Sequence, residues 1–192
     1  MTESFKQEQK KEEIETPKKK FMHLLDTEEV EVKRLTAEDV EECVKVMRKC
    51  AFDVTETEVG NIISYNKSFG ATVNRMLVGV GLAWPAKLDL DSKKIVGGDP
   101  NALYLEDPAV LLAYEGRGIR RILLKEREKE ALESELKYTI GYLYEDMPKG
   151  NIADYITEAG SMLEKLYLSE NYEFSRTKKG ILAFKKLSDS SI

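Results

Sequence analysis

The stretch that decides the fold is Glu115-Gly116-Arg117-Gly118-Ile119-Arg120, which joins an apolar run, Tyr104–Ala113, to a long charged helical pattern, Ile119–Leu136. A strand that ends at two glycines and continues as a helix gathers backbone N–H groups at one point. These donors and the positive end of the helix favour an anion, above all a phosphate. Gly116 and Gly118 permit a tight turn and a close approach by the ligand.

Three arginines add positive charge at the same place: Arg117, Arg120 and Arg121. Two other nucleotide-binding motifs are absent. No G-x-x-x-x-G-K-[ST] occurs, and Arg121 stands where a dinucleotide fingerprint has its third glycine. The turn therefore predicts a phosphate-bearing ligand, with an ordinary strand-to-helix turn as the alternative interpretation of a lone G-x-G.

The wider segment Tyr104–Leu124 resembles the acyl-CoA-binding segment of the GNAT superfamily of N-acetyltransferases. That family has [QR]-x-x-G-x-[GA] before a helix, and Gly118 matches its central glycine. Glu115 departs from the family's Gln or Arg, and Arg120 departs from its Gly or Ala. The resemblance implies an acetyl-CoA site that comprises Val110, Leu111, Leu112, Glu115, Gly116, Arg117, Gly118, Ile119, Arg120 and Arg121.

The two departures predict specific local contacts. The Arg120 side chain must either turn away from the site or contact the phosphates itself. The Glu115 carboxylate lies near the expected anion, and we expect Arg117 or Arg121 to neutralise it.

A second segment, Leu166–Phe174, resembles the family's late helix-to-strand junction, which is usually written LYEKLGFE. Asn171 occupies the usual glycine position, and Asn is the next-best residue for a left-handed helix C-cap. Tyr167 falls on the tyrosine that often serves as general acid in the family.

The resemblance covers about residues 30–187 and implies an α/β (α+β) fold. The expected architecture is a mixed, mostly antiparallel sheet of six to seven strands, flanked by about four helices, with a splayed fourth and fifth strand pair. Residues 1–29 are predicted to be a charged tail, and residues 30–192 the GNAT-like domain. The apolar side chains within residues 21–25 favour docking on the domain or on a second subunit, so a homodimer is one expectation.

Local patterns predict several turns and breaks. We expect a hairpin turn near Asn74-Arg75, a polar connection over residues 85–101 and a helix over residues 151–169 with a break at Gly160-Ser161. Pro108 removes a hydrogen-bond donor from its strand, which predicts a bulge or splay there.

Composition excludes several classes of function. The net charge of −5 argues against a nucleic-acid-binding surface. No apolar run approaches the roughly 20 residues of a membrane span, and the charged first residues predict no secretory signal. Cys43 and Cys50 are interpreted as reduced thiols of a cytoplasmic protein. Without a C-x-x-C, and with His23 as the single histidine, no metal site is predicted.

Acetyl transfer to an amine requires an anchored donor, a base for the ammonium and an acid for the leaving thiolate. Tyr167 is the candidate acid, and Glu106 or Asp107 the candidate base; the alternatives are a core aromatic residue and solvated carboxylates. The leading hypothesis is an N-acetyltransferase that uses acetyl-CoA and a primary amine, by direct attack. An inactive GNAT-like acyl-CoA sensor or interaction module, and an unrelated nucleotide-binding protein, remain as alternatives.

Overall fold

The computed structural model describes residues 29–143 and 150–188. Within these ranges the strands form two sheets, of order β1-β2-β3-β7 and β5-β4-β6-β8-β10-β9. The strands are β1 (Glu31–Arg34), β2 (Phe69–Val73), β3 (Met76–Gly81), β4 (Ala83–Asp89), β5 (Lys94–Val96), β6 (Ala102–Leu105), β7 (Ala109–Val110), β8 (Tyr138–Leu143), β9 (Glu173–Thr177) and β10 (Gly180–Lys186). The helices are α2 (Val40–Lys49), α3 (Glu56–Ile63), α4 (Ile119–Glu133), α5 (Ile152–Ala159) and α6 (Met162–Ser169), with 3₁₀ turns at Ala37–Asp39 and Leu112–Tyr114.

Two interrupted strands connect the sheets. β3 and β4 are separated by Leu82, and β6 and β7 by Glu106–Pro108. These interruptions raise the number of short strands above the six to seven expected from the sequence, while the mixed α/β architecture is as predicted. Pro108 lies within the second interruption, as its missing N–H predicts.

The sheet opens where β6 and β8 part. These two strands pair in parallel from Ala102↔Tyr138 to Tyr104↔Ile140. β8 then continues to Leu143 alongside β10, whereas β6 ends and the chain turns toward β7. This is the splayed strand pair that the family resemblance predicted.

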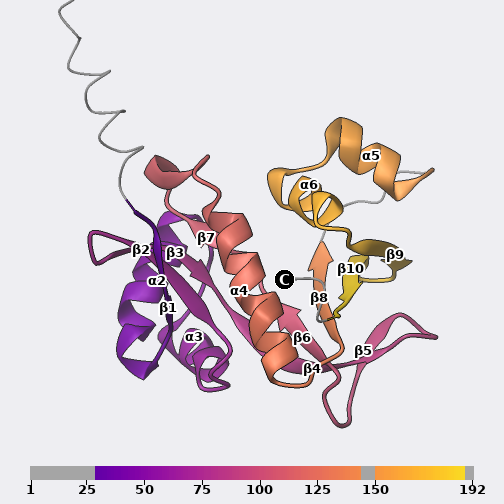
Figure 1. Cartoon of the computed structure of the whole chain (residues 1–192), viewed down its shortest axis with the longest axis horizontal. Coiled ribbons are helices and arrows are strands. Elements are labelled where there is room, and N and C mark those ends of the chain that lie inside the picture. The colour runs from indigo at the N-terminus through magenta and orange to yellow at the C-terminus, as the bar shows by residue number, and fades with distance from the viewer. Residues whose placement is uncertain (1–28, 144–149, 189–192) are drawn as a thin grey trace, which may run out of the picture.

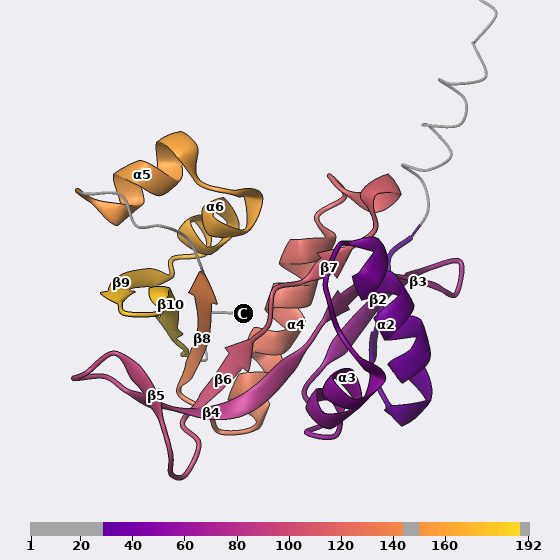
Figure 2. The same cartoon turned by 180° about the vertical axis from the view of Figure 1, so that it is seen from behind.

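Helix α4 lies in the middle of the molecule, between the indigo-to-magenta N-terminal part and the orange-to-yellow C-terminal part (Figure 1). Its apolar side chains Ile119 and Leu123 pack against one face of the first sheet. The opposite face of that sheet packs against α2 and α3 through a second cluster that includes Cys43, Val44 and Val59. Seen from behind, α5 and α6 lie at the end of the second sheet, beyond β8 (Figure 2).

Several predicted local features are confirmed. Asn74 and Arg75 both have positive φ in the β2–β3 turn, Gly160 separates α5 from α6, and Asn171 has a φ of 63° directly after the C-cap of α6. The polar connection predicted for residues 85–101 is wrong. Lys87 to Asp89 of β4 pair with β5 instead, because this short segment alternates charged and apolar side chains.

The predicted tail, residues 1–28, and the apolar residues 21–25 within it lie outside the described residues. None of the described helices has the length and apolar character needed to cross a membrane.

Candidate functional site

The glycine turn has the conformation that its sequence requires. Gly116 has a φ of 81°, and Gly118, the N-cap residue of α4, has a φ of 73°. An added Cβ at either position would meet no atom within 4 Å. Both glycines are therefore required by backbone conformation rather than by lack of space.

A cavity of about 360 Å³ lies at this turn, and we call it the turn cavity. Its walls are the start of α4 and one face of α6. It is lined by Glu115, Gly116, Gly118, Ile119, Arg120, Arg121, Met162, Lys165, Leu166 and Ser169. The four residues of α6 were not among the predicted site residues, although their i, i+3, i+4, i+7 spacing marks a single helix face.

Arg120 and Glu115 form an ion pair, which explains why both depart from the family pattern together. The Arg120 Nη2–Glu115 Oε1 distance is 2.6 Å, and Arg120 Nη1 donates to the carbonyl of Pro108 at 2.8 Å. The expectation that Arg117 or Arg121 would neutralise Glu115 is therefore wrong. Arg120 is the partner because its side chain folds back over the turn toward the end of the splayed strand.

The remaining residues of the predicted acyl-CoA segment have other contacts. The Arg117 guanidinium lies 5.1 Å from the ring centroid of Tyr114. Arg121 pairs with Glu170 of the α6–β9 junction, at 2.9 Å.

Three predicted residues precede the turn and are absent from the lining of its cavity. Val110 is buried in β7, where its carbonyl accepts a bond from Cys50 Sγ. Leu111 packs in the core, and Leu112, at 88% exposed, lies on the surface.

A second cavity, of about 420 Å³, lies between the diverging strands, and we call it the splay cavity. Asp107 and Pro108 line it from the β6 side, Leu143 from β8 and Glu164 from α6. It shares Arg120 and Met162 with the turn cavity, so the two adjoin. A ligand whose phosphates lie on the turn can therefore extend an arm between the strands.

Tyr167 lies beneath the point where the strands part. A Cβ added to Gly141 of β8 would lie 3.1 Å from the Tyr167 hydroxyl and 3.3 Å from the Leu105 carbonyl of β6. The side chain is 1% exposed, and its hydroxyl has no hydrogen-bond partner among the described residues. Burial raises the pKa of Tyr167, so the hydroxyl keeps its proton at neutral pH. Over residues 29–143 and 150–188 it is a proton donor without an acceptor.

A third cavity, of about 400 Å³, continues from the splay cavity along the sheet face, and we call it the acid-lined cavity. Phe52 and Asp107 line both. Glu106 lines the third cavity and its Oε1 accepts a bond from Trp84 Nε1, at 2.8 Å.

Asp107 is exposed to solvent, but the walls of the splay and acid-lined cavities, both of which it lines, partly desolvate its carboxyl group. This partial desolvation and, after it, the charge of Glu106 raise the pKa of Asp107. A carboxylate with a raised pKa is a better proton acceptor, so Asp107 has the chemistry of a general base. Over residues 29–143 and 150–188, no cluster of three or more His, Cys, Asp or Glu could hold a metal ion.

The bend that carries these carboxylates is fixed by Arg127, which is 1% exposed on α4. Arg127 Nη1 donates to the carbonyl of Leu82 at 3.0 Å and to that of Glu106 at 2.9 Å. The guanidinium thus joins the two strand interruptions. The sequence alone placed Arg127 in a charged helical pattern and gave no sign of this role.

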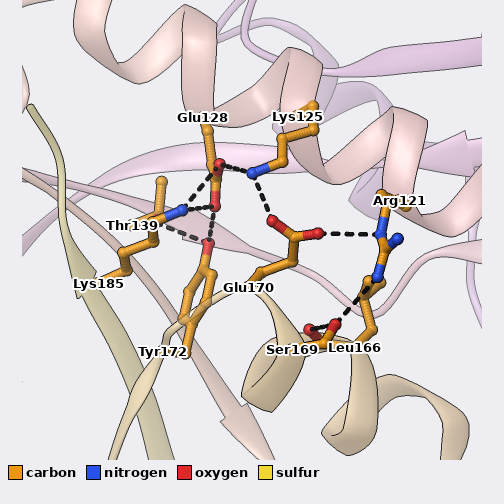
Figure 3. A network of polar contacts seen from close by, with 9 residues as sticks. All are labelled: Arg121, Lys125, Glu128, Thr139, Leu166, Ser169, Glu170, Tyr172 and Lys185. Atoms are coloured by element: carbon orange, nitrogen blue, oxygen red, sulfur yellow. Dashed lines mark hydrogen bonds and ion pairs between the residues drawn. The ribbon is translucent and has the colours of Figure 1, made fainter. Parts of the chain in front are cut away.

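A network of charged and polar side chains fixes α6 against α4 and β10 (Figure 3). Buried Glu128 accepts bonds from Lys125, Tyr172 and Lys185, each at 3.0–3.2 Å. Lys125 also pairs with Glu170, at 2.5 Å. Because the buried carboxylate has several donors, the network is satisfied and holds the helix that carries Tyr167.

No family model and no curated protein sequence matches the chain. Several solved structures, however, are similar to it in fold. The loading GNATL domain of CurA from Lyngbya majuscula has a TM-score of 0.64 at 14% identity, over 82% of this chain and 98% of that one.

Two further structures contain a bound coenzyme. The PaiA N-acetyltransferase from Thermoplasma acidophilum, in complex with coenzyme A, has a TM-score of 0.60 at 16% identity, with 83% and 99% of the two chains covered. The GphF GNAT-like decarboxylase, in complex with isobutyryl-CoA, has a TM-score of 0.64 at 13% identity, with 82% and 100% covered. The architecture, the splayed strands and these similarities agree, and the chain is a protein of the GNAT fold.

Proposed function

We propose that this protein is an N-acetyltransferase that moves the acetyl group of acetyl-CoA to a primary amine by direct attack. The observation that carries the proposal is the run of three adjoining cavities. They lead from a glycine turn at a helix start, between the diverging strands, to a cavity lined by carboxylates. The buried Tyr167 hydroxyl, which has no hydrogen-bond partner among the described residues, lies where these strands part. A phosphate group, a thioester and a cationic amine match these three environments in order.

In this mechanism the chain's residues orient the reactants and move two protons. The backbone N–H groups at the start of α4 and the positive helix end bind the phosphates. Asp107 accepts the proton that the ammonium loses, and the amine nitrogen attacks the thioester carbon. The C–S bond then breaks, Tyr167 donates its proton to the leaving thiolate, and the second proton of the attacking nitrogen restores the Tyr167 hydroxyl. Gly141 leaves the room that the hydroxyl occupies, because a Cβ at this residue would lie 3.1 Å from it.

Replacement of Tyr167 by Phe tests the mechanism. The hydroxyl has no hydrogen-bond partner in the described part of the chain, so its removal is not expected to lower stability. Turnover, measured as CoA released from acetyl-CoA with an amine, should fall by about 10²–10⁴-fold, the usual contribution of an acid catalyst. The dissociation constant of CoA should be unchanged. Full turnover in Tyr167→Phe would show that another group protonates the thiolate.

The second candidate function is a non-catalytic acyl-CoA sensor or interaction module. The observation that favours it is the Arg120 side chain, which lines both the turn and splay cavities while bound to Glu115 and Pro108. In that position it narrows the path between them. Binding of CoA without acetyl transfer to any amine tested would support this candidate over the enzyme.

A cytoplasmic location is part of the same proposal. Cys43 and Cys50 are both free thiols, and burial raises the pKa of each. These properties support a protein that works in a reducing compartment.

A further inference from the structure

The acid-lined cavity combines apolar walls with carboxylates at two separate places. Its apolar lining is Met47, Phe52, Val54, Val59, Ile62, Leu82, Tyr104 and Tyr142. The rings of Tyr104 and Tyr142 lie 6.5 Å apart on the same sheet face. Methylene groups pack well on such walls, and the faces of aromatic rings attract ammonium groups.

The carboxylates lie in two pairs. Glu106 and Asp107 come from the interruption between β6 and β7, while Asp53 and Glu58 come from the α2–α3 region. Hydrogen bonds from Thr55 lower the pKa of Glu58, so it is charged at neutral pH. No lysine, arginine or histidine occurs in the described lining of this cavity. Its field therefore favours cations and disfavours anions.

A separate acidic side chain lines the adjoining splay cavity. Glu164 lines that cavity, is 1% exposed, and its Oε2 accepts a bond from the Ser161 N–H, at 2.5 Å. Its Oε1 is buried and accepts no bond from the part of the chain that the structure describes. An acceptor oxygen left without a donor is costly in a protein interior. A ligand that brings N–H groups into this space would supply the missing donor.

We propose that the acceptor is a dication: an aliphatic diamine or polyamine with two ammonium groups joined by methylenes. This inference rests on the proposed function and names its acceptor. The amine that reacts lies at Asp107, next to the splay cavity. The second ammonium binds between Asp53 and Glu58, and the methylenes lie on the apolar walls.

The test compares two amines with the same four-carbon chain, 1,4-diaminobutane and 1-aminobutane, by titration calorimetry of the full chain. We expect the diamine to bind at least about tenfold more tightly, because its second charge meets a second carboxylate pair. Equal affinities, or no binding of the diamine, would overturn the proposal.

Variants then locate the second ammonium. Glu58→Gln keeps the capping box of α3, since Gln is accepted at that position. It should remove most of the preference for the diamine, and Asp53→Asn should do the same. Glu56→Gln, an exposed position on the same helix and outside the cavity lining, is the matched control and should retain the preference. An unchanged preference in Glu58→Gln and Asp53→Asn would refute this placement.

The titrations need no CoA, so the two proposals can fail separately. Diamine binding to a protein that does not bind CoA would refute the acetyltransferase and leave the dication site standing. If the protein binds CoA and acetylates both amines with equal kcat/KM, the acetyltransferase proposal stands and the dication site is refuted.

Discussion

Gly81 and Arg127 depend on each other, and this coupling can be measured. A Cβ built on Gly81 lies 3.1 Å from Arg127 Nε and 3.2 Å from its Cζ, closer than nearly all Cβ contacts. The guanidinium cannot easily move, because it donates to the carbonyls of Leu82, Leu123 and Glu106 at 2.9–3.0 Å. Gly81→Ala should therefore strain the point where the two sheets join.

The expected magnitude follows from opposing effects. Overpacking in a core costs about 1–3 kcal/mol. Replacing a strand glycine by alanine stabilises the folded protein by about 0.5–1 kcal/mol. This gain applies at Gly81 because its φ is not positive. Gly81→Ala should thus destabilise the protein by about 1–2 kcal/mol. In a protein that already carries Arg127→Ala, the new Cβ at position 81 no longer meets the guanidinium. Gly81→Ala should then be neutral or slightly stabilising.

Urea unfolding of the wild type, the two single variants and the double variant gives the coupling free energy. We expect about 2 kcal/mol, with the double variant more stable than the sum of the single effects predicts. Additivity within about 0.5 kcal/mol would refute the reasoning, because independent sites behave in that way.

Three further changes test the site. Gly118→Ala places a side chain at a φ of 73°. This change should lower the free energy of unfolding by about 1–2 kcal/mol and weaken CoA binding. An unaltered CoA affinity would show that the turn does not hold the phosphates. Arg120→Gly leaves Glu115 without its ion-pair partner. Tighter CoA binding in this variant would identify the Arg120 side chain as an obstruction, and weaker binding would identify it as a phosphate ligand. An unchanged CoA affinity would exclude Arg120 from the site. Asp107→Asn tests the raised pKa. The fold disfavours ionised Asp107, so wild-type stability falls as pH rises above the usual value of 3.8. The Tm of the variant relative to the wild type should increase from pH 3 to pH 7, and a constant difference would contradict the shift.

The features that could be predicted from the sequence are those with local causes. The turn at Asn74-Arg75, the break at Gly160 and the C-cap at Asn171 each depend on backbone preferences of one or two residues. The strand-to-helix junction around Gly118 has the same kind of cause. Such signals remain valid whatever the rest of the chain packs against.

The features that could not be predicted depend on partners far away in the sequence. Arg127, Glu128 and Glu130 belong to a charged helical pattern but are all buried. Glu130 pairs with Arg34 and Lys67, which lie 96 and 63 positions earlier in the sequence. Burial of these charges follows from tertiary contacts, which helical periodicity does not encode.

The ion pair between Glu115 and Arg120 illustrates the same limit within the site itself. Each residue alone contradicts the family pattern. Their charges compensate only because the turn brings positions 115 and 120 together and directs Arg120 to the Pro108 carbonyl. Sequence comparison position by position treats such a pair as two independent departures.

The proposed function requires that the turn cavity binds the phosphates of an acyl-CoA. Titration calorimetry of the purified chain with CoA, and in parallel with acetyl-CoA, tests it most directly. We expect one site with a micromolar dissociation constant for both compounds. A folded protein that binds neither compound would contradict it.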